Sequence, residues 1–164
     1  ISRRVEAVLH DLEANTVHLF WPLRGEVDLR ALADRLRRRG RTVVLPVVTG
    51  PRRLEHRVLE SRQAGEADAD ALVPGPWGLV EPPTTASLVT PADLEAVVVP
   101  GLAFGRDGTR LGMGGGYYDT FLTETDATRI GVAFQDAVLE TVPVEAHDAR
   151  VHIVVTDAET IQIR

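Results

Sequence analysis

Apolar residues recur at helical spacing in two segments near the start of the chain. Residues 3–14 place valines and leucines on one side of a helix. A second helix is predicted over 28–39, where Asp28 can begin it and Gly40 can end it. Its apolar face would consist of Leu29, Leu32, Ala33 and Leu36.

Short apolar runs, rich in β-branched residues, separate the predicted helices. Such runs are typical of strands that are buried on both faces of a parallel sheet. We expect strands at 16–21, 42–46, 96–100, 129–134 and 152–156, and a further candidate at 53–60. Because strands alternate with helices, the sequence predicts an α/β fold. It would be a single domain over residues 1–164, built as a three-layer sandwich with a mainly parallel sheet.

A tight turn and a glycine run mark the second half of the chain. Asp107-Gly108 is a strong signal for a tight turn, which would join extended segments at 102–104 and 109–111. The glycines at 114–116 then open another helix. Tyr117, Tyr118, Phe121 and Leu122 lie on this helix.

The composition excludes several classes of protein. Apolar residues make up 44% of the 164 residues and charged residues 26%, as is ordinary for a globular domain. There is no cysteine, which excludes disulfides and thiolate zinc sites and favours the cytoplasm. The net charge of −6 argues against a nucleic-acid partner. No apolar run reaches the roughly 20 residues that a membrane helix needs.

The stretch 112–116 is the strongest candidate for chemistry. Four of its five residues are glycine, so the backbone can adopt positive φ and approach a ligand closely. A helix that follows such a loop offers unpaired N–H groups to a phosphate. The loop is neither a Walker A motif, because no Gly-Lys-Ser/Thr follows, nor a Rossmann fingerprint, because Tyr117 takes the third glycine position. A plain turn is the alternative, but Arg110 and Asp119 beside the loop favour a nucleoside triphosphate with its metal ion.

Three motifs in this region together form a longer signature. They are Pro-Gly-Leu-Ala-Phe at 100–104, Asp-Gly-Thr-Arg-Leu-Gly at 107–112 and Gly-Gly-Gly-Tyr-Tyr-Asp at 114–119. This signature resembles that of the 5-formyltetrahydrofolate cyclo-ligases, also called methenyltetrahydrofolate synthetases. Further matching stretches are 26–28, 40–46, 78–82, Gln135, 143–148 and Thr156. The resemblance therefore covers the chain from about Val17 to Thr156.

The resemblance implies a reaction that depends on ATP and Mg²⁺. The formyl oxygen of 5-formyltetrahydrofolate would attack the γ-phosphate of ATP, and N10 of the folate would then close the ring. The products would be 5,10-methenyltetrahydrofolate, ADP and phosphate. Phosphorylation converts an amide-like oxygen, which is a poor leaving group, into a good one. The protein would therefore mainly position the reactants and neutralise charge.

The same resemblance assigns roles to particular residues. ATP would be bound by Arg110, Leu111, Gly112, Met113, Gly114, Gly115, Gly116, Tyr117 and Tyr118. Arg110 and Tyr117 would be the catalytic residues. Folate would contact Trp21, Glu26, Met113 and Tyr117, with the Glu26 carboxylate accepting paired N–H bonds from the pterin. Asp119 and Asp148 would bind Mg²⁺.

Each of these residues also has a purely structural interpretation. Asp119 could be a favourable acid in the first turn of its helix, and Glu26 could be a surface charge. Trp21 and the tyrosines could be core or rim aromatics. The stretch from His147 to His152 contains two histidines and Asp148, but its spacing matches no standard zinc motif.

The N-terminal region departs from the resemblance. Cyclo-ligases carry an N-terminal helix whose Lys and Arg reach the ATP phosphates. The 25 residues before Glu26 are too few for that helix as well as the one at 3–14. We therefore expect the ATP-binding helix to be missing from this sequence. Either the sequence begins at Ile1 inside a longer protein, or the protein is a shortened paralogue.

Two other functions compete with the cyclo-ligase reaction. One is a non-catalytic paralogue that binds nucleotide or folate as a regulator or carrier. The weaker one is a sugar-phosphate isomerase-like enzyme, which rests on fold analogy alone. For the enzyme we expect 5-formyltetrahydrofolate, with or without a polyglutamate tail, as substrate, and a monomer with no membrane partner.

Overall fold

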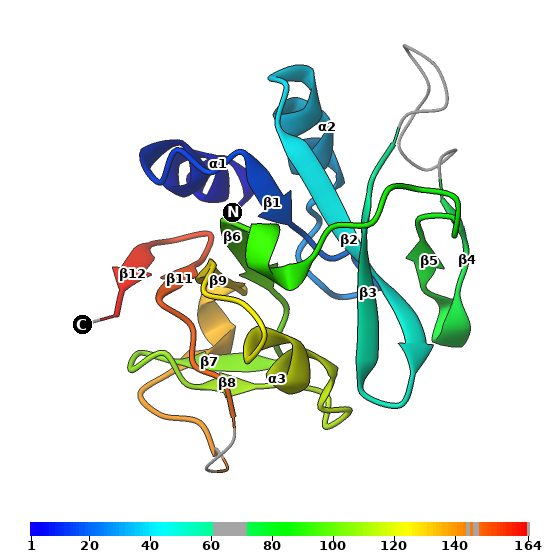
Figure 1. The fold of residues 1–164 in the computed structure, drawn as a ribbon. Coiled ribbons are helices and arrows are strands. Elements are labelled where there is room, and N and C mark those ends of the chain that lie inside the picture. Colours follow the sequence, from blue (N-terminus) through cyan, green and yellow to red (C-terminus); the bar gives the residue numbers. More distant parts are fainter. Residues whose placement is uncertain (61–71, 144, 146–147, 164) are drawn as a thin grey trace.

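A seven-stranded sheet forms the centre of the protein. The computed structural model describes residues 1–60, 72–143, 145 and 148–163 (Figure 1). The strands lie in the order β12 (Thr160–Gln162), β11 (Ile153–Val155), β9 (Thr128–Val132), β6 (Ala96–Val99), β1 (Thr16–His18), β2 (Thr42–Gly50) and β3 (Arg53–Val58). The neighbours from β11 to β2 pair in parallel, whereas the edge strands β12 and β3 are antiparallel. The predicted mainly parallel α/β fold is thereby confirmed.

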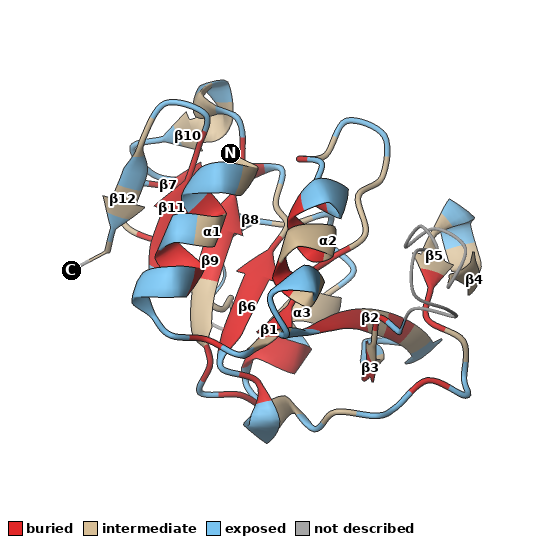
Figure 2. Cartoon of the chain, turned by 90° about the horizontal axis from the view of Figure 1, so that it is seen from above, coloured by how far each residue is buried: buried red, intermediate tan, exposed pale blue. Residues whose placement is uncertain are grey.

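Two helices cover one face of this sheet. They are α1 (Ser2–Asp11) and α2 (Arg30–Arg38), and they lie side by side over the buried strands β6 and β11 in Figure 2. Val5 and Leu9 of α1 and Leu32 and Leu36 of α2 enter one core with the strands. Arg35 also donates a hydrogen bond to Glu6 of α1 over 2.7 Å, which ties the two helices together at their surface.

Smaller elements cover the opposite face. They are α3 (Tyr117–Leu122) and a three-stranded sheet in the order β10 (Val138–Leu139), β7 (Ala103–Gly105) and β8 (Arg110–Leu111). Phe104, Phe121 and Leu122 pack there in a second core. The predicted turn at Asp107-Gly108 joins β7 to β8, and Gly108 has a φ of +85°. Helices, sheet and these smaller elements make the three expected layers.

The remaining described elements are short. A separate two-stranded sheet pairs β4 (Val73–Pro74) with β5 (Val80–Glu81). Three 3₁₀ helices are η2 (Pro76–Gly78), η3 (Pro91–Asp93) and η4 (Gln135–Ala137). Within the described part of the chain, no helix is long and apolar enough to cross a membrane.

Two strand boundaries differ from the sequence prediction in a way that shapes the site. β1 ends at His18, three residues before the predicted end, while β2 continues through Pro46 to Gly50. The last residue of β2 that pairs with β1 is Val44. After Val44, β2 has no neighbouring strand on the side of β1, so its backbone needs no N–H donor there. Pro46, which lacks an N–H, is therefore tolerated. The early end of β1 frees the following segment to turn away from the sheet.

Candidate functional site

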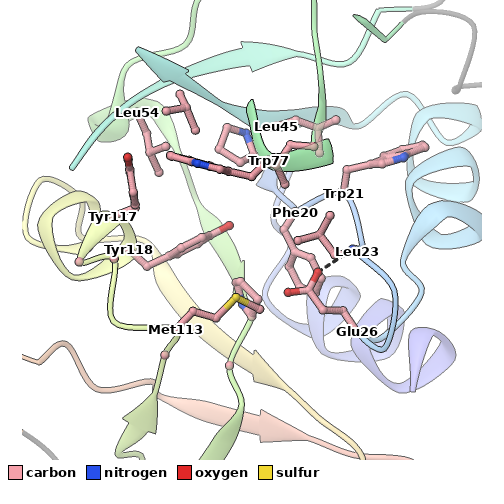
Figure 3. Close-up of a pocket in the computed structure, with 18 of the residues that line it drawn as sticks. Phe20, Trp21, Leu23, Glu26, Leu45, Leu54, Trp77, Met113, Tyr117 and Tyr118 are labelled. Carbon is pink, nitrogen blue, oxygen red and sulfur yellow. Dashed lines mark hydrogen bonds between the residues drawn. The ribbon is translucent and has the colours of Figure 1, made fainter. Parts of the chain in front are cut away.

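A cavity of about 440 Å³ opens where β1 and β6 end. In parallel sheets, ligands bind beyond the carboxyl ends of the strands. The segment after β1 supplies Phe20, Trp21, Leu23 and Glu26 to the wall, and β2 adds Leu45 (Figure 3). Most of this wall is apolar, as is usual for a cavity that binds a small organic molecule.

The glycine loop forms the facing wall. Every residue from Gly112 to Asp119 lines the cavity, together with Arg110. Gly114 and Gly116 have φ values of +80° and +68°, which other residues rarely adopt. A β-carbon at Gly112 would lie 2.8 Å from Nη1 of Arg110, so only glycine lets the loop pass so close to this side chain. These glycines are therefore needed for both the turn and the close approach.

Arg110 and Asp119 form a buried ion pair behind the glycine loop. Nη2 of Arg110 lies 2.6 Å from Oδ1 of Asp119, and the two side chains are only 5% and 18% exposed. Arg110 also donates to the carbonyl of Pro100 over 3.3 Å and lies 5.9 Å from the centre of the Tyr118 ring. Its buried Nε has no hydrogen-bond partner among the described residues. The pair therefore joins β8 to α3, and one buried N–H of the guanidinium remains without a partner among the described residues.

The two predicted metal ligands come from neighbouring segments. Oδ1 of Asp119 accepts a hydrogen bond from the backbone N–H of Ala149 over 3.4 Å, and Ala149 follows Asp148. Oδ2 of Asp148 accepts from the N–H of Glu145 over 2.7 Å. Asp119 is thus more than a first-turn acid, because it is the ion-pair partner of Arg110.

These residues do not form a complete metal cage by themselves. Within the described ranges, no three His, Cys, Asp or Glu side chains are arranged to hold an ion. Mg²⁺ in nucleotide sites is, however, commonly held by one or two carboxylates plus phosphate oxygens and water. All the hydrogen bonds of Asp119 to described residues use Oδ1. Its Oδ2 therefore fits one position in such a shared site.

Glu26 lies in the cavity wall rather than on the open surface. It is half-buried, and its Oε2 accepts a hydrogen bond from the N–H of Leu23 over 2.8 Å (Figure 3). Burial raises the pKa of the Tyr118 hydroxyl, Arg110 opposes this shift, and Glu26 adds to it. That hydroxyl has no hydrogen-bond partner in the described ranges. Glu26 and Tyr118 are thus among the few polar groups that line this mostly apolar cavity.

The structure gathers most of the predicted site residues around one cavity. Trp21, Glu26, Arg110 and the stretch 112–119 all line it. Two predicted residues lie outside the lining, namely Leu111 on β8 and Asp148, which adjoins the contact to Asp119. Their predicted roles stay predictions.

Trp77 and Glu81 were not predicted as site residues, yet both line the cavity. Trp77 has a φ of +55° and is 71% exposed, and its ring centre lies 5.9 Å from that of Tyr117. Glu81 is only 7% exposed. The sequence predicts only loops around them. Two signals were available: Glu81 lies in the matching stretch 78–82, and Trp77 is an aromatic residue between a proline and a glycine in a loop, where binding residues are often found.

Two buried histidines of the main sheet pack against α3. The rings of His18 on β1 and His56 on β3 have centres 5.1 Å apart, and both lie against Phe121 of α3, at 4.9 and 4.1 Å. None of their ring nitrogens has a hydrogen-bond partner among the described residues. Burial lowers the pKa of His56 to about 4, against a smaller opposite effect of Glu55. The pKa of His18 is also lowered, mainly by burial and to a smaller extent by the neighbouring His56.

The fold and the cavity together define an α/β protein with a cavity between a glycine loop, backed by a buried guanidinium, and a mostly apolar wall. A protein-family model described as the 5-formyltetrahydrofolate cyclo-ligase family matches residues 1–157. The 5-formyltetrahydrofolate cyclo-ligase of Mycolicibacterium smegmatis is 32% identical over 157 residues, which are 93% of this chain and 79% of that protein. The Escherichia coli K12 enzyme of the same name is 32% identical over 150 residues, covering 89% and 80%.

A solved structure agrees with these relatives. The NMR structure of 5,10-methenyltetrahydrofolate synthetase from Aquifex aeolicus matches 99% of this chain and 81% of its own, with 31% identity and a TM-score of 0.82. The chain therefore belongs to the 5-formyltetrahydrofolate cyclo-ligase family, which consists of ATP-dependent ligases. The resemblance found in the sequence is thereby confirmed.

The buried histidines predict that the protein loses stability in mild acid. The imidazole of unfolded His56 takes up a proton below its ordinary pKa of 6.5, whereas the folded one resists until about pH 4. Stability should therefore fall as the pH decreases through this window, by about 3 kcal/mol for His56 alone. Replacing His56 by Leu should flatten the dependence of the free energy of unfolding on pH, measured by urea denaturation between about pH 7 and about pH 4.5.

His10 offers a matched control for this measurement. It lies on α1 with its side chain 75% exposed, so His10→Gln should leave the pH dependence as it is in the parent. An unchanged slope in His56→Leu would contradict the assigned role of the buried pair.

Proposed function

We propose that the protein catalyses the ATP-dependent cyclisation of 5-formyltetrahydrofolate to 5,10-methenyltetrahydrofolate, with release of ADP and phosphate. One observation carries this proposal within the family assignment. The glycine loop with Arg110 and the segment with Glu26 form facing walls of a single cavity. A phosphate donor on one wall and a folate on the other would meet there.

The proposed chemistry has two balanced steps. The formyl oxygen attacks the γ-phosphorus of ATP, the bond from this phosphorus to the β-phosphate oxygen breaks, and ADP leaves. N10 then attacks the former formyl carbon, phosphate departs with the formyl oxygen, and N10 loses its proton. The barrier is lowered mainly by orientation of the reactants and by donors placed where negative charge develops.

We assign the phosphates to the glycine loop. The backbone from Gly114 to Gly116 can approach a phosphate closely because these three residues carry no side chain, and a β-carbon at Gly114 would have no atom within 4 Å. The guanidinium of Arg110, which is paired with Asp119, adds polar N–H groups to the same wall. Asp119, with Asp148, would hold the Mg²⁺, and the bound ion would neutralise phosphate charge.

We assign the folate to the apolar part of the cavity. The Glu26 carboxylate accepts only one hydrogen bond from the described residues, so it can also accept N–H groups of the pterin. Trp21, Met113 and Tyr117 line the same space and offer flat or flexible apolar contacts. A polyglutamate tail on the substrate, a monomeric state and a cytoplasmic location stay predictions.

The proposal is tested by the reaction itself. The protein, extended by any encoded residues before Ile1, is incubated with 5-formyltetrahydrofolate, ATP and Mg²⁺. The near-ultraviolet absorbance of the methenyl product should rise only when all three are present. A folded protein that binds ATP or folate without this rise would instead be a non-catalytic binder, and the enzymatic proposal would be wrong.

A substitution at Glu26 tests the folate assignment. Glu26→Gln keeps an oxygen that can accept from the N–H of Leu23, but it removes the charge. Folate binding should weaken by about 1–3 kcal/mol, the usual effect of losing a charged hydrogen-bond partner, while ATP binding stays the same. Calorimetric titration with each ligand measures both. Glu140→Gln is the control, because that side chain is 91% exposed. Equal folate affinity in Glu26→Gln and the parent would show that the charge of Glu26 does not contribute to folate binding.

A substitution at Asp119 tests the metal assignment. Asp119→Asn leaves the buried Arg110 without its counter-ion, so the free energy of unfolding should fall by roughly 3–5 kcal/mol. Turnover should fall by orders of magnitude, since the ion neutralises charge during phosphoryl transfer. Turnover per folded molecule is therefore measured at a low temperature, across a range of Mg²⁺ concentrations. If Asp119→Asn turned over like the parent and required the same Mg²⁺ concentration, Asp119 would not be a metal ligand, and its role would be limited to the ion pair with Arg110.

A further inference from the structure

The hairpin of β4 and β5 carries Trp77 across the mouth of the cavity. Among the strands that the structure describes, these two pair only with each other, and η2 forms the tip of the hairpin. Figure 3 shows the Trp77 ring between Tyr117 of α3 and the segment that carries Trp21. Because β4 and β5 lie outside the main sheet, the backbone hydrogen bonds between the strands of that sheet do not fix the position of this hairpin.

Trp77 is poorly held by its own contacts. It is 71% exposed, and its positive φ of 55° is unfavourable for a residue with a β-carbon. The surrounding turn is closed by two backbone hydrogen bonds, from Gly75 to Leu79 over 2.9 Å and from Leu79 to Pro76 over 3.0 Å. Such a conformation persists only where its surroundings impose it. The hairpin must therefore be anchored elsewhere.

Glu81 is the polar anchor of the hairpin. Its side chain is buried, and Oε1 accepts a hydrogen bond from the N–H of Val48 on β2 over 3.0 Å. The same side chain lies against Gly75, where a β-carbon would come within 2.5 Å of its Cδ and 2.7 Å of its Oε2. One carboxylate thus contacts the long strand β2 at one end and the turn at the other.

We propose that Glu81 is a positioning residue, which holds the turn at Gly75 against β2 so that Trp77 covers the folate cavity beside Tyr117. This inference rests on the proposed function for its effect on turnover. Glu81 would act through Trp77 and not through contact with the substrate. Its loss should therefore raise KM for folate, while kcat and the KM for ATP change little, because Arg110, Asp119 and the glycine loop stay in place.

Three variants test this anchor by changing either Glu81 or Gly75, the two residues that meet there. Glu81→Leu removes the acceptor for the N–H of Val48, and Gly75→Ala forces the turn away from Glu81 without touching the cavity. Both should raise KM for folate roughly tenfold, which corresponds to about 1.4 kcal/mol. Glu81→Gln keeps an acceptor oxygen of the same shape and should retain a KM near that of the parent. Gly50→Ala is the matched control, because a β-carbon there meets only Arg53 at 3.8 Å.

A fluorescence measurement makes the test independent of turnover. The chain has two tryptophans, so a Trp21→Phe background leaves Trp77 as the only indole. In ligand-free protein, Glu81→Leu and Gly75→Ala should increase acrylamide quenching of Trp77, and Gly50→Ala should not. This readout remains valid if the protein has no ligase activity, so failure of the proposed function and failure of the anchor can be told apart.

The outcomes decide between positioning and direct recognition. Increased quenching in Gly75→Ala supports the anchor even if Glu81→Leu does not fold. Unchanged quenching in both variants overturns it. In an active protein, a tenfold rise of KM in Glu81→Gln as well would also overturn it, because the charge of Glu81 would then itself contact the substrate.

Discussion

The buried ion pair between Arg110 and Asp119 is the interaction on which the site depends. It spans 2.6 Å and joins the end of β8 to the first turn of α3. A buried charge without a partner is strongly unfavourable, so each residue needs the other. The glycine loop is the chain that connects them. With its two ends fixed, the loop passes close to the guanidinium, and a β-carbon at position 112 would lie 2.8 Å from Nη1 of Arg110.

This constraint extends to the aromatic residues of α3. With Asp119 held, Tyr118 lies over Arg110, and Phe121 packs on the two buried histidines. Tyr117 then points to the other side of the cavity, where Trp77 meets it. Six residues make up α3, too few for helix propensity alone to hold it in water. Its tertiary contacts therefore determine where the glycine loop stands.

The sequence predicts the parts of this site that lie close together in the chain. The turn at Asp107-Gly108 and the glycine run follow from local backbone chemistry, and the motif resemblance brought Glu26 into the same site. The pairing of Arg110 with Asp119 was not predicted, because spacing alone does not show that two charges share a buried space. Glu81 was missed for a similar reason, since its partner Val48 is 33 residues away. The residue at which β1 ends depends on how far it pairs with β2. Strand propensity does not predict such pairing between distant segments.

The apolar wall of the cavity has a chemical consequence for a phosphoryl transfer. A formyl oxygen is a weak nucleophile, and water in the same place would compete for the γ-phosphate. Phe20, Leu45 and Leu54 line the space with side chains that cannot hold water by hydrogen bonds. In the proposed site the guanidinium of Arg110, paired with Asp119, would lie at the edge of this space, where a hydrogen bond to phosphate would be stronger than in water. Excluding water and placing a guanidinium in a region of low polarity would thus both follow from setting one buried ion pair beside an apolar cavity.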